Sequence, residues 1–306
     1  MVQKNSINNK VIVIVGPTAS GKTSLAIEIA KLLDSEIISA DSMNVYKGLD
    51  IGTAKPTIEE MQGVKHHLID VVSPFESFSV GDYKEKAKPI LDNLINEGKI
   101  PIICGGTGFY VNSLLFEMSY GNVPADLETR NKYMDLAKKY GNQYVFSILQ
   151  EKDYETSLKL HPNDLKRVVR ALEICENGVK KSQLNDILTP LYDYQAFSFD
   201  FDRSLLYQRI EKRVDVMIEN GLIDEVKSLV DLGVNHSHQC MQGIGYKEIY
   251  DYINNKTSLE DAISLLKQNT RRYAKRQITF FKKLPNLTLL KPENVKDVAK
   301  RIVENL

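Results

Sequence analysis

A glycine-rich loop close to the start of the chain constrains the fold more than any other feature. Residues 11–30 read VIVIVGPTASGKTSLAIEIA: a β-branched run, a turn matching G-x-x-x-x-G-K-[ST], and an amphipathic helical pattern. Glycines let backbone N–H groups turn inward, the helix N-terminus adds positive partial charge, and the lysine supplies a cation. We therefore predict a site for two adjacent phosphates, with the Thr23 hydroxyl placed to bind Mg²⁺. The predicted site consists of Gly16, Pro17, Thr18, Ala19, Ser20, Gly21, Lys22 and Thr23. A purely structural glycine turn is the alternative.

The loop does not decide which molecule carries the phosphates. ATP or GTP is the usual ligand of such a loop, and a second acidic magnesium ligand at a strand end then accompanies it. Only Asp70, in HLIDV, follows a suitable apolar run. The sequence also lacks the arginine-rich lid segment of small-molecule kinases. Both observations weaken the assignment of a nucleotide, and neither excludes it.

The rest of the chain predicts a discontinuous α/β fold. Short apolar runs at residues 11–15, 36–40, 68–72 and 100–104 alternate with helical patterns at 24–33 and 83–96. This alternation is typical of a parallel sheet covered on both faces, here a sheet like that of P-loop NTPases flanked by helices. Helices joined by turns follow after Phe116, and strand-like runs return at 196–201 and 287–290. We expect a core of residues 1–115 plus 196–306 that carries the phosphate loop, and a mostly helical insertion at 116–195.

Composition indicates a cytoplasmic protein. Forty basic and forty acidic residues balance, so net charge alone predicts no polyanionic partner. Three scattered cysteines without a CxxC pair argue against disulfides or structural zinc. The polar N-terminus lacks the apolar region of a signal peptide, and the run at 11–15 is too short to span a membrane. We expect a monomer without a membrane partner.

Two further segments follow predicted strands and should lie beside the phosphate loop. Asp41 ends the run EIISA, and carboxyl ends of strands line the ligand crevice of an open α/β sheet. Its carboxylate could take a proton or hold a metal, or it could simply cap the next turn. Thr107 lies in GGTGFY, a second glycine turn, where its hydroxyl could bind a phosphate or bridging oxygen. A tight strand-to-helix turn is the alternative there.

Taken together, these motifs resemble the bacterial tRNA dimethylallyltransferases. GPTASGKT, SADSMNVYKGLDIGTAKP, HHLIDV, PIICGGTGFY, HPNDLKRVVRALEI, RIEKRVDVMIENGLIDEV, GIGYKE and AKRQITFFKK occur in the order and spacing of that family, from about residue 11 to about residue 290. The resemblance implies transfer of a dimethylallyl group from its diphosphate to the exocyclic N6 amine of an adenosine, releasing diphosphate. The adenosine is the one 3′ of the anticodon, position 37, in tRNAs reading codons that begin with U. A P-loop core whose helical insertion grips the anticodon stem-loop is implied as well.

The resemblance also assigns roles to residues. The loop at 18–23 would hold the diphosphate, with Lys22 and Mg²⁺ neutralising its charge as it leaves. Asp41 would act as general base toward the adenine amine, and Thr107 would bind near the bridging oxygen. Arg213 matches the arginine that reaches the diphosphate, but Arg209 lies one helical turn away, and the choice between them stays open.

The RNA-binding residues are predicted partly from charge. Residues 262–292 contain eight basic residues and no acidic one, so a helix there would present a basic face. Such a face is often merely solvated, whereas the resemblance favours phosphate contacts. The predicted tRNA-binding residues are Asp41, Ser42, Met43, Asn44, Thr107, Arg130, Arg167, Arg170, Gly243, Gly245, Tyr246, Lys247, Lys275, Arg276 and Gln277. Arg170 could instead pair with Glu173. The turn at 243–247 suits contact with an unstacked anticodon base, and Tyr273 could anchor its helix or stack on a base.

Three alternatives remain open from the sequence. A P-loop small-molecule kinase would turn over ATP without a prenyl donor. An adenylate isopentenyltransferase would act on free AMP or ATP, although a mononucleotide requires neither a long helical insertion nor a basic C-terminal segment. A non-enzymatic RNA-binding module would leave the phosphate loop unexplained. For a prenyltransferase the acceptor base has to swing out of the tRNA loop, and we expect tRNA and the prenyl diphosphate to reach the site from opposite ends.

Overall fold

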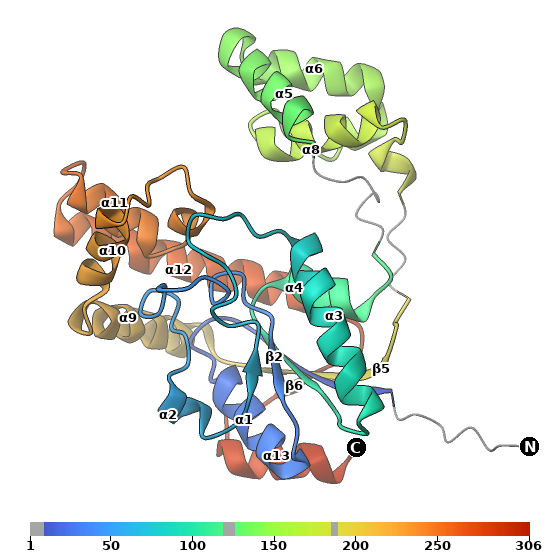
Figure 1. Ribbon diagram of the computed structural model, residues 1–306, viewed down its shortest axis with the longest axis vertical. Coiled ribbons are helices and arrows are strands. Elements are labelled where there is room, and N and C mark those ends of the chain that lie inside the picture. Colours follow the sequence, from blue (N-terminus) through green and yellow to red (C-terminus); the bar gives the residue numbers. More distant parts are fainter. Residues whose placement is uncertain (1–8, 119–125, 185–188) are drawn as a thin grey trace, which may run out of the picture. The chain divides into compact units, whose positions relative to one another are not determined.

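The structure, a computed structural model, describes residues 9–118, 126–184 and 189–306 (Figure 1). The chain forms two compact units. Residues 1–115 and 190–306 make up the first unit, and residues 116–189 make up the second. The expected boundary at residue 196 falls inside strand β5 (Asp193–Phe199), so the core resumes at residue 190 instead. The start of β5 was missed because its first residues, DYQ, are polar or aromatic rather than apolar.

The described part of the first unit contains a six-stranded parallel sheet. Its strands in chain order are β1 (Lys10–Val15), β2 (Ile37–Ser39), β3 (His66–His67), β4 (Ile102–Gly105), β5 (Asp193–Phe199) and β6 (Leu287–Leu290). In space their order is β3-β2-β4-β1-β5-β6, and every pair is parallel. The predicted α/β class with a parallel sheet is therefore confirmed. Because β1, β2 and β4 are neighbours, the loops that follow them meet at one edge of the sheet.

The expected strand at residues 68–72 is wrong. Strand β3 ends at His67, and Val72 forms only an isolated bridge with Tyr46. Leu68 and Asp70 have positive φ angles of 62° and 55°, which interrupt an extended conformation. This apolar run is therefore an irregular segment directly after β3.

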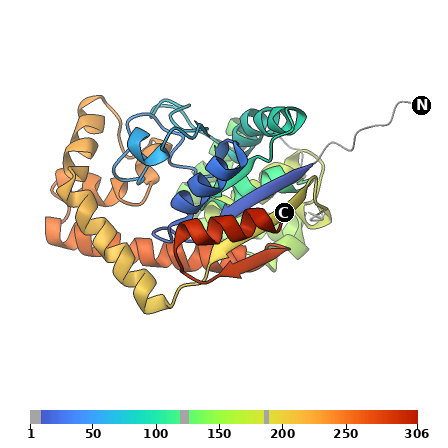
Figure 2. The ribbon, with the colours of Figure 1, turned by 90° about the horizontal axis from the view of Figure 1, so that it is seen from below.

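Helices cover both faces of the sheet. On one face α1 (Lys22–Leu33) and α13 (Val295–Glu304) pack against each other and share a core with β1, β4 and β5 (Figure 2). On the other, α3 (Val80–Asn96) and α4 (Gly108–Leu115) pack together, and the rings of Tyr83 and Tyr110 stack at 3.9 Å between centroids. Both α1 and α4 begin directly after a glycine turn, so their N-termini lie at the edge where the loops meet.

The C-terminal half of the first unit adds a group of helices. They are α9 (Arg203–Glu219), α10 (Leu222–Asp231), α11 (Tyr246–Ile253) and α12 (Leu259–Phe281), while the short α2 (Ile58–Met61) lies earlier in the chain. Helix α12 packs against α4, α9 and α11. Its buried residues are Ala262, Leu266, Ala274, Gln277 and Phe281, which share one face at helical spacing. Most of its basic residues therefore lie on other faces.

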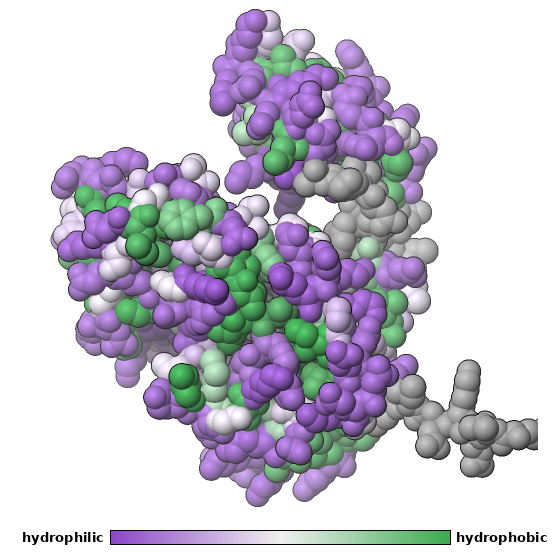
Figure 3. All heavy atoms as spheres, in the orientation of Figure 1, coloured by the Kyte–Doolittle hydropathy of each residue, from purple (hydrophilic) through white to green (hydrophobic). Residues whose placement is uncertain are grey.

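The second unit is helical in its described residues. It contains α5 (Leu127–Tyr140), α6 (Asn142–Lys152), α7 (Tyr154–Ser157) and α8 (Leu165–Glu176). Its core is formed by residues such as Tyr133, Phe146 and Leu172, and its visible face is mostly hydrophilic (Figure 3). In the described ranges of both units, no helix has the length and apolar character needed to cross a membrane.

We expect Glu36, just before β2, to make stability sensitive to acid. Its carboxylate lies 2.6 Å from His67 Nε2, 3.1 Å from Lys99 Nζ and 3.2 Å from Lys65 Nζ. Burial by itself raises the pKa of Glu36. The hydrogen bonds lower it by more than burial raises it, so the net change is from 4.5 to about 2. Because the folded pKa is depressed, this stabilisation is complete above pH 4.5 and is lost as the pH falls toward 2.

The variant Glu36→Gln should therefore lose less stability than the parent protein over that pH range. Urea unfolding at a series of pH values measures the free energy of unfolding, with Glu219→Gln, an exposed carboxylate at the end of α9, as the control. Equal acid sensitivity of Glu36→Gln and the parent would contradict the assignment.

Candidate active site

The phosphate loop is open to an anion. Gly16, Ala19 and Gly21 have φ angles of 140°, 63° and 82°, and these conformations carry the backbone from β1 around to the first turn of α1. Gly21 is the N-cap of α1, and no side chain in the described part of the chain caps the first N–H groups of this helix. The described first turn of α1 also contains no acidic residue. The hydroxyl oxygen of Ser20 is buried without a hydrogen-bond partner among the described residues. The N–H groups of this helix terminus therefore suit an anionic ligand.

Lys22 places a poorly solvated cation in the loop. Its Nζ lies 3.4 Å from the carbonyl oxygen of Pro17. Burial lowers the pKa of Lys22, the nearby Asp41 carboxylate opposes this shift, and Arg213 adds to it. A bound phosphate would restore the interactions that the ammonium group loses when it leaves water.

Two arginines of α9 flank the loop. Arg213 Nη1 lies 3.4 Å from the hydroxyl oxygen of Thr18. The guanidinium of Arg209 lies over the ring of Phe201, 4.9 Å from its centroid, and also faces Gly21. Burial lowers the pKa of Arg213, and the charge of Arg209 lowers it further. The structure thus brings both candidate arginines to the loop, with Arg213 directed at a loop hydroxyl.

Asp41 follows β2 at the same edge of the sheet. Its Oδ1 accepts a hydrogen bond of 2.9 Å from the N–H of Met43, so the side chain caps its own turn. Its Oδ2 has no hydrogen-bond partner among the described residues. The capping role and a chemical role are therefore compatible, since one oxygen holds the turn and the other is left for a ligand.

Thr107 connects the ends of β2 and β4. Its N–H donates to the carbonyl oxygen of Ala40 at 3.0 Å, and its Oγ1 accepts from the N–H of Ser42 at 2.9 Å. The hydroxyl donates in turn to Ser42 Oγ at 3.2 Å. A Cβ at Gly105 would lie 2.2 Å from the Ala40 oxygen, so only glycine permits this close approach of the two strands. These bonds hold the Thr107 hydroxyl beside the segment that carries Asp41.

Tyr273 belongs to this cluster, although its sequence context suggested only anchoring or base stacking. The pKa of its hydroxyl is raised by burial and by the Asp41 carboxylate, while the nearby Thr107, Arg276 and Gln277 side chains oppose the rise. Tyr273 and Gln277 are four residues apart in α12 and therefore share a face. The spacing of four residues indicates that Tyr273 and Gln277 lie together, but the sequence does not say which face of α12 meets the sheet.

The predicted contact of Gln277 with tRNA requires correction. Its side chain is buried: Oε1 accepts from the N–H of Thr18 at 3.0 Å, and Nε2 donates to the carbonyl oxygen of Gly106 at 3.0 Å. The amide is therefore turned toward the two glycine turns and away from solvent. The neighbouring Lys275 and Arg276 are exposed, and the Arg276 guanidinium lies 5.7 Å from the centroid of the Tyr273 ring.

The predicted base contact of Tyr246 also requires correction. Tyr246 is fully buried, and its hydroxyl donates to Glu225 Oε1 at 2.6 Å. The same carboxylate accepts three backbone N–H groups, at 2.9, 2.7 and 3.1 Å, from Asp50, Ile51 and Gly52. The ring is thus part of the support for the loop after β2 and is not available to stack on a base.

The other residues of the predicted RNA-binding turns take different positions. Met43 packs against Gly243, where a Cβ would lie 2.4 Å from its Cε. Asn44 is buried, and Gly245 has a φ of 100° at the start of α11. Lys247 is half-exposed, with its Nζ 3.5 Å from Glu248. Of these residues, only the side chain of Lys247 combines charge with access to solvent.

The loop after β2 also contains a buried lysine. Lys55 Nζ contacts Asp50 Oδ1 and Asp70 Oδ1, each at 2.5 Å, and the carbonyl oxygen of Tyr46 at 2.9 Å. The carboxylate of Asp70 is therefore occupied by a lysine. This contradicts its candidacy as an acidic magnesium ligand.

In the second unit, two predicted RNA-binding arginines converge on a buried carboxylate. Arg130 Nε lies 3.0 Å from Glu173 Oε2, and Arg170 Nη1 lies 2.9 Å from Glu173 Oε1. Burial by itself raises the pKa of Glu173. Hydrogen bonds from the Asp126 N–H and from both arginines outweigh burial, so the net pKa is lowered. The intramolecular pairing, which the sequence left open, is the arrangement found. Arg167 differs, since its side chain is 67% exposed and lies 3.4 Å from Asp164.

The site fits Mg²⁺ only in combination with a phosphate ligand. The described residues contain no cluster of three or more His, Cys, Asp or Glu side chains able to hold a metal. Mg²⁺ commonly keeps several waters and takes one or two protein oxygens together with phosphate oxygens. The half-buried hydroxyl of Thr23, in the first turn of α1, suits that role.

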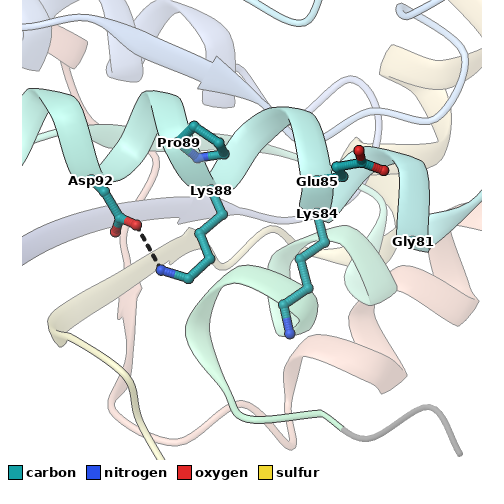
Figure 4. Close-up of a pocket in the computed structure, with 6 residues that line it drawn as sticks. All are labelled: Gly81, Lys84, Glu85, Lys88, Pro89 and Asp92. Carbon is teal, nitrogen blue, oxygen red and sulfur yellow. Dashed lines mark hydrogen bonds and ion pairs between the residues drawn. The ribbon is translucent and has the colours of Figure 1, made fainter. Parts of the chain in front are cut away.

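Pockets are found along α3 and beside the phosphate loop. One of about 400 Å³ lies along α3 and is lined by Gly81, Lys84, Glu85, Lys88, Pro89 and Asp92 (Figure 4). Lys88 there pairs with Asp92 at 2.6 Å. A second pocket, of about 100 Å³, lies behind the phosphate loop and is lined by Gly16, Pro17, Ser198 and neighbouring residues. The first pocket is remote in chain position from every predicted site residue, so the phosphate loop remains the candidate site.

Comparisons with known proteins agree with this geometry. The IPP transferase family model matches residues 44–284. The tRNA dimethylallyltransferase of Acetivibrio thermocellus is 46% identical over 302 residues, covering 97% of this chain and 96% of that protein. The crystal structure of the tRNA isopentenylpyrophosphate transferase from Bacillus halodurans is similar with a TM-score of 0.73 and 42% identity, covering 97% of this chain and 96% of that chain. A eukaryotic dimethylallyltransferase acting on tRNA gives a TM-score of 0.82 at 30% identity, covering 97% of this chain and 77% of that chain.

Removal of the Glu173 carboxylate should destabilise the second unit. Glu173→Ala leaves two arginines and the Asp126 N–H without their buried acceptor, which we expect to cost about 3 kcal/mol. Hydrogen exchange in peptides from α5 and α8 measures this local free energy of opening. Glu151→Ala, an exposed change in α6, is the control, and equal effects of the two variants would show that the buried pairing contributes little.

Proposed function

This chain belongs to the IPP transferase family, and we propose that it transfers a dimethylallyl group from dimethylallyl diphosphate to the exocyclic N6 amine of an adenosine in tRNA, releasing diphosphate. The proposed acceptor is the adenosine 3′ of the anticodon, position 37, in tRNAs reading codons that begin with U. The convergence of the open phosphate loop, the Asp41 carboxylate and the Thr107 hydroxyl at one edge of the sheet carries the proposal. That edge offers an anion cradle, a base and a hydrogen-bond donor together.

The proposed reaction is a substitution at the first carbon of the prenyl chain. A bond forms between that carbon and N6 of the adenine, and the bond from the carbon to the bridging oxygen breaks. The electron pair of the broken bond leaves with the diphosphate, and the proton released from N6 passes to Asp41. Oδ2 is the oxygen assigned to this proton, because Oδ1 accepts the Met43 N–H.

Stabilisation of the leaving diphosphate is the second part of the mechanism. The exocyclic amine is a poor nucleophile, so alignment and charge stabilisation supply most of the catalysis. The Lys22 ammonium, the Arg213 guanidinium and the N–H groups of the phosphate loop bind the diphosphate. The Thr107 hydroxyl donates to the bridging oxygen, exchanging its long 3.2 Å bond to Ser42 for a bond to developing negative charge.

Mg²⁺ completes the diphosphate site in this proposal. The Thr23 hydroxyl would hold the ion together with oxygens of the diphosphate. When bound, the ion neutralises negative charge on the leaving group.

The tRNA partner is assigned to exposed basic residues. On α12, Arg272, Lys275 and Arg276 are all exposed, and their charges suit the phosphates of an anticodon stem-loop. In the second unit the exposed Arg167 has the same role, whereas Arg130 and Arg170 are held by Glu173. The acceptor base leaves its stack to reach Asp41, as bases do in other enzymes that act on them. A tRNA substrate also places the activity in the cytoplasm.

Direct transfer to an RNA hairpin tests the proposal. The protein is incubated with Mg²⁺, dimethylallyl diphosphate and an anticodon stem-loop carrying adenosine at position 37, and mass spectrometry follows the RNA. We expect a gain of one dimethylallyl group on that adenosine. Parallel reactions use AMP as acceptor, or ATP in place of the prenyl donor. Transfer to AMP alone, or ATP hydrolysis without prenylation, would contradict the proposal.

Asp41→Asn should remove the base without disturbing the turn. Asparagine keeps an oxygen for the Met43 N–H but does not take up a proton, so single-turnover transfer should slow by about 10²- to 10⁴-fold. Diphosphate binding should stay within about twofold, since this change leaves the phosphate loop intact. Asp34→Asn, at the exposed end of α1 where φ is 46°, is the control. A fast Asp41→Asn enzyme would exclude Asp41 as the base.

Arg213→Gln should weaken diphosphate binding more than Arg209→Gln. Arg213 already reaches the Thr18 hydroxyl, whereas Arg209 stacks on Phe201. Loss of a charged hydrogen bond to the ligand predicts a rise in Kd of roughly tenfold or more for Arg213→Gln. Calorimetry with inorganic diphosphate and Mg²⁺ gives both constants, and the reverse order would assign the diphosphate contact to Arg209.

A further inference from the structure

Gln277 connects the two glycine turns of the active site. We propose that Gln277 is a positioning residue that holds the phosphate loop in register with the Thr107 turn, so that the donor diphosphate and the hydroxyl facing its bridging oxygen stay aligned. The inference rests on the proposed transfer reaction and adds a role for a residue that touches neither substrate. It replaces the predicted contact of Gln277 with tRNA.

The hydrogen bonds of the amide require this residue type. Oε1 accepts from the Thr18 N–H and Nε2 donates to the Gly106 carbonyl oxygen, each at 3.0 Å, in a side chain that is only 4% exposed. A primary amide donates and accepts at the same time, whereas an ionised carboxylate only accepts and an ammonium only donates. The Cβ of any residue other than glycine at position 106 would lie 2.1 Å from Nε2, so the turn is shaped to admit the amide.

The two hydrogen-bond partners of the amide, Thr18 and Gly106, lie next to groups assigned to the reaction. Thr18 also carries the hydroxyl that Arg213 contacts at 3.4 Å, and Gly106 immediately precedes Thr107. The two turns come from different strands, β1 and β4, and both are rich in flexible glycine. The amide therefore sets the spacing between the diphosphate cradle and the hydroxyl that faces the bridging oxygen. Displacement of such groups by about 1 Å can cost on the order of 10²-fold in rate.

Helix α12 carries the proposed positioning residue and the proposed RNA-binding residues on different faces. Gln277 lies on the buried face of α12, whereas Lys275 and Arg276 are exposed on it. Loss of the amide should therefore slow the transfer step and leave tRNA affinity unchanged. If Gln277 contacted RNA, its loss should instead weaken tRNA binding and leave the transfer step unchanged.

Gln277→Glu gives a test with a pH signature. The ionised carboxylate keeps the bond to the Thr18 N–H but repels the Gly106 oxygen, whereas the protonated carboxyl restores both bonds. Burial raises the pKa of such a carboxyl, so the protonated form becomes more populated as the pH falls. The charged and titratable groups of this part of the site include Lys22, Asp41, Cys104, Arg209, Arg213, Tyr273 and Arg276, and they are common to variant and parent. The ratio of the two rates therefore isolates residue 277.

We expect Gln277→Glu to transfer roughly ten- to a hundredfold more slowly than the parent at pH 8, with the ratio of variant to parent rates rising as the pH falls toward 6. Gln277→Met has a side chain of similar length but cannot form either bond. Its transfer should be slow, with a ratio of variant to parent rates that does not change with pH. Gln268→Glu, which adds the same charge to an exposed position of α12, is the matched control and should behave as the parent. Binding of an anticodon stem-loop should change less than twofold in all three.

Two outcomes would overturn the inference: a Gln277→Glu enzyme as fast as Gln268→Glu, or weakened stem-loop binding with an unchanged single-turnover rate. Should Gln277→Glu fail to fold, Gln277→Met together with stem-loop binding decides between the same alternatives. Failure of the proposed function itself is recognised separately, because the parent protein would then transfer nothing. Calorimetry with inorganic diphosphate and Mg²⁺ adds a readout independent of transfer, with weaker binding expected for both Gln277 variants than for Gln268→Glu.

Discussion

Unbalanced positive charge at the phosphate loop is the constraint on which the rest of the site depends. The first turn of α1 presents backbone N–H groups without a capping side chain, and Lys22 stands beside them with its pKa lowered by burial. Arg213 adds a second cation at Thr18. This arrangement favours an anionic ligand beside the loop.

The segment after β2 is held in place by ion pairs and hydrogen bonds within the protein. Lys55 joins two carboxylates and a carbonyl oxygen, and Glu225 gathers three N–H groups and the Tyr246 hydroxyl. Buried ionic groups of this kind are tolerated because each is fully hydrogen-bonded. Asp41, earlier in the same segment, caps its own turn with one carboxylate oxygen.

The features predicted correctly are those whose determinants are adjacent in sequence. Strand, glycine turn and helix follow one another in the first 33 residues, so local periodicity and the G-x-x-x-x-G-K-[ST] pattern indicate them together. Apart from the expected strand at residues 68–72 and the boundary at residue 196, the differences concern packing. Gln277 and Tyr246 were assigned to RNA and are buried, and the pairing of Arg130 with Glu173 joins residues 43 positions apart. Spacing alone does not say which face of a helix meets the protein.

The sequence by itself determined the α/β class, the phosphate cradle and the residues at the ends of β1, β2 and β4, because each depends on a short contiguous pattern. Only the tertiary structure decided which polar side chains face inward. Tyr273 and Gln277 join the site because α12 packs against α4 and α9 with that face toward the glycine turns. The physical reason is that buried amides and hydroxyls are placed by partners far away in the chain, and no local pattern records those partners.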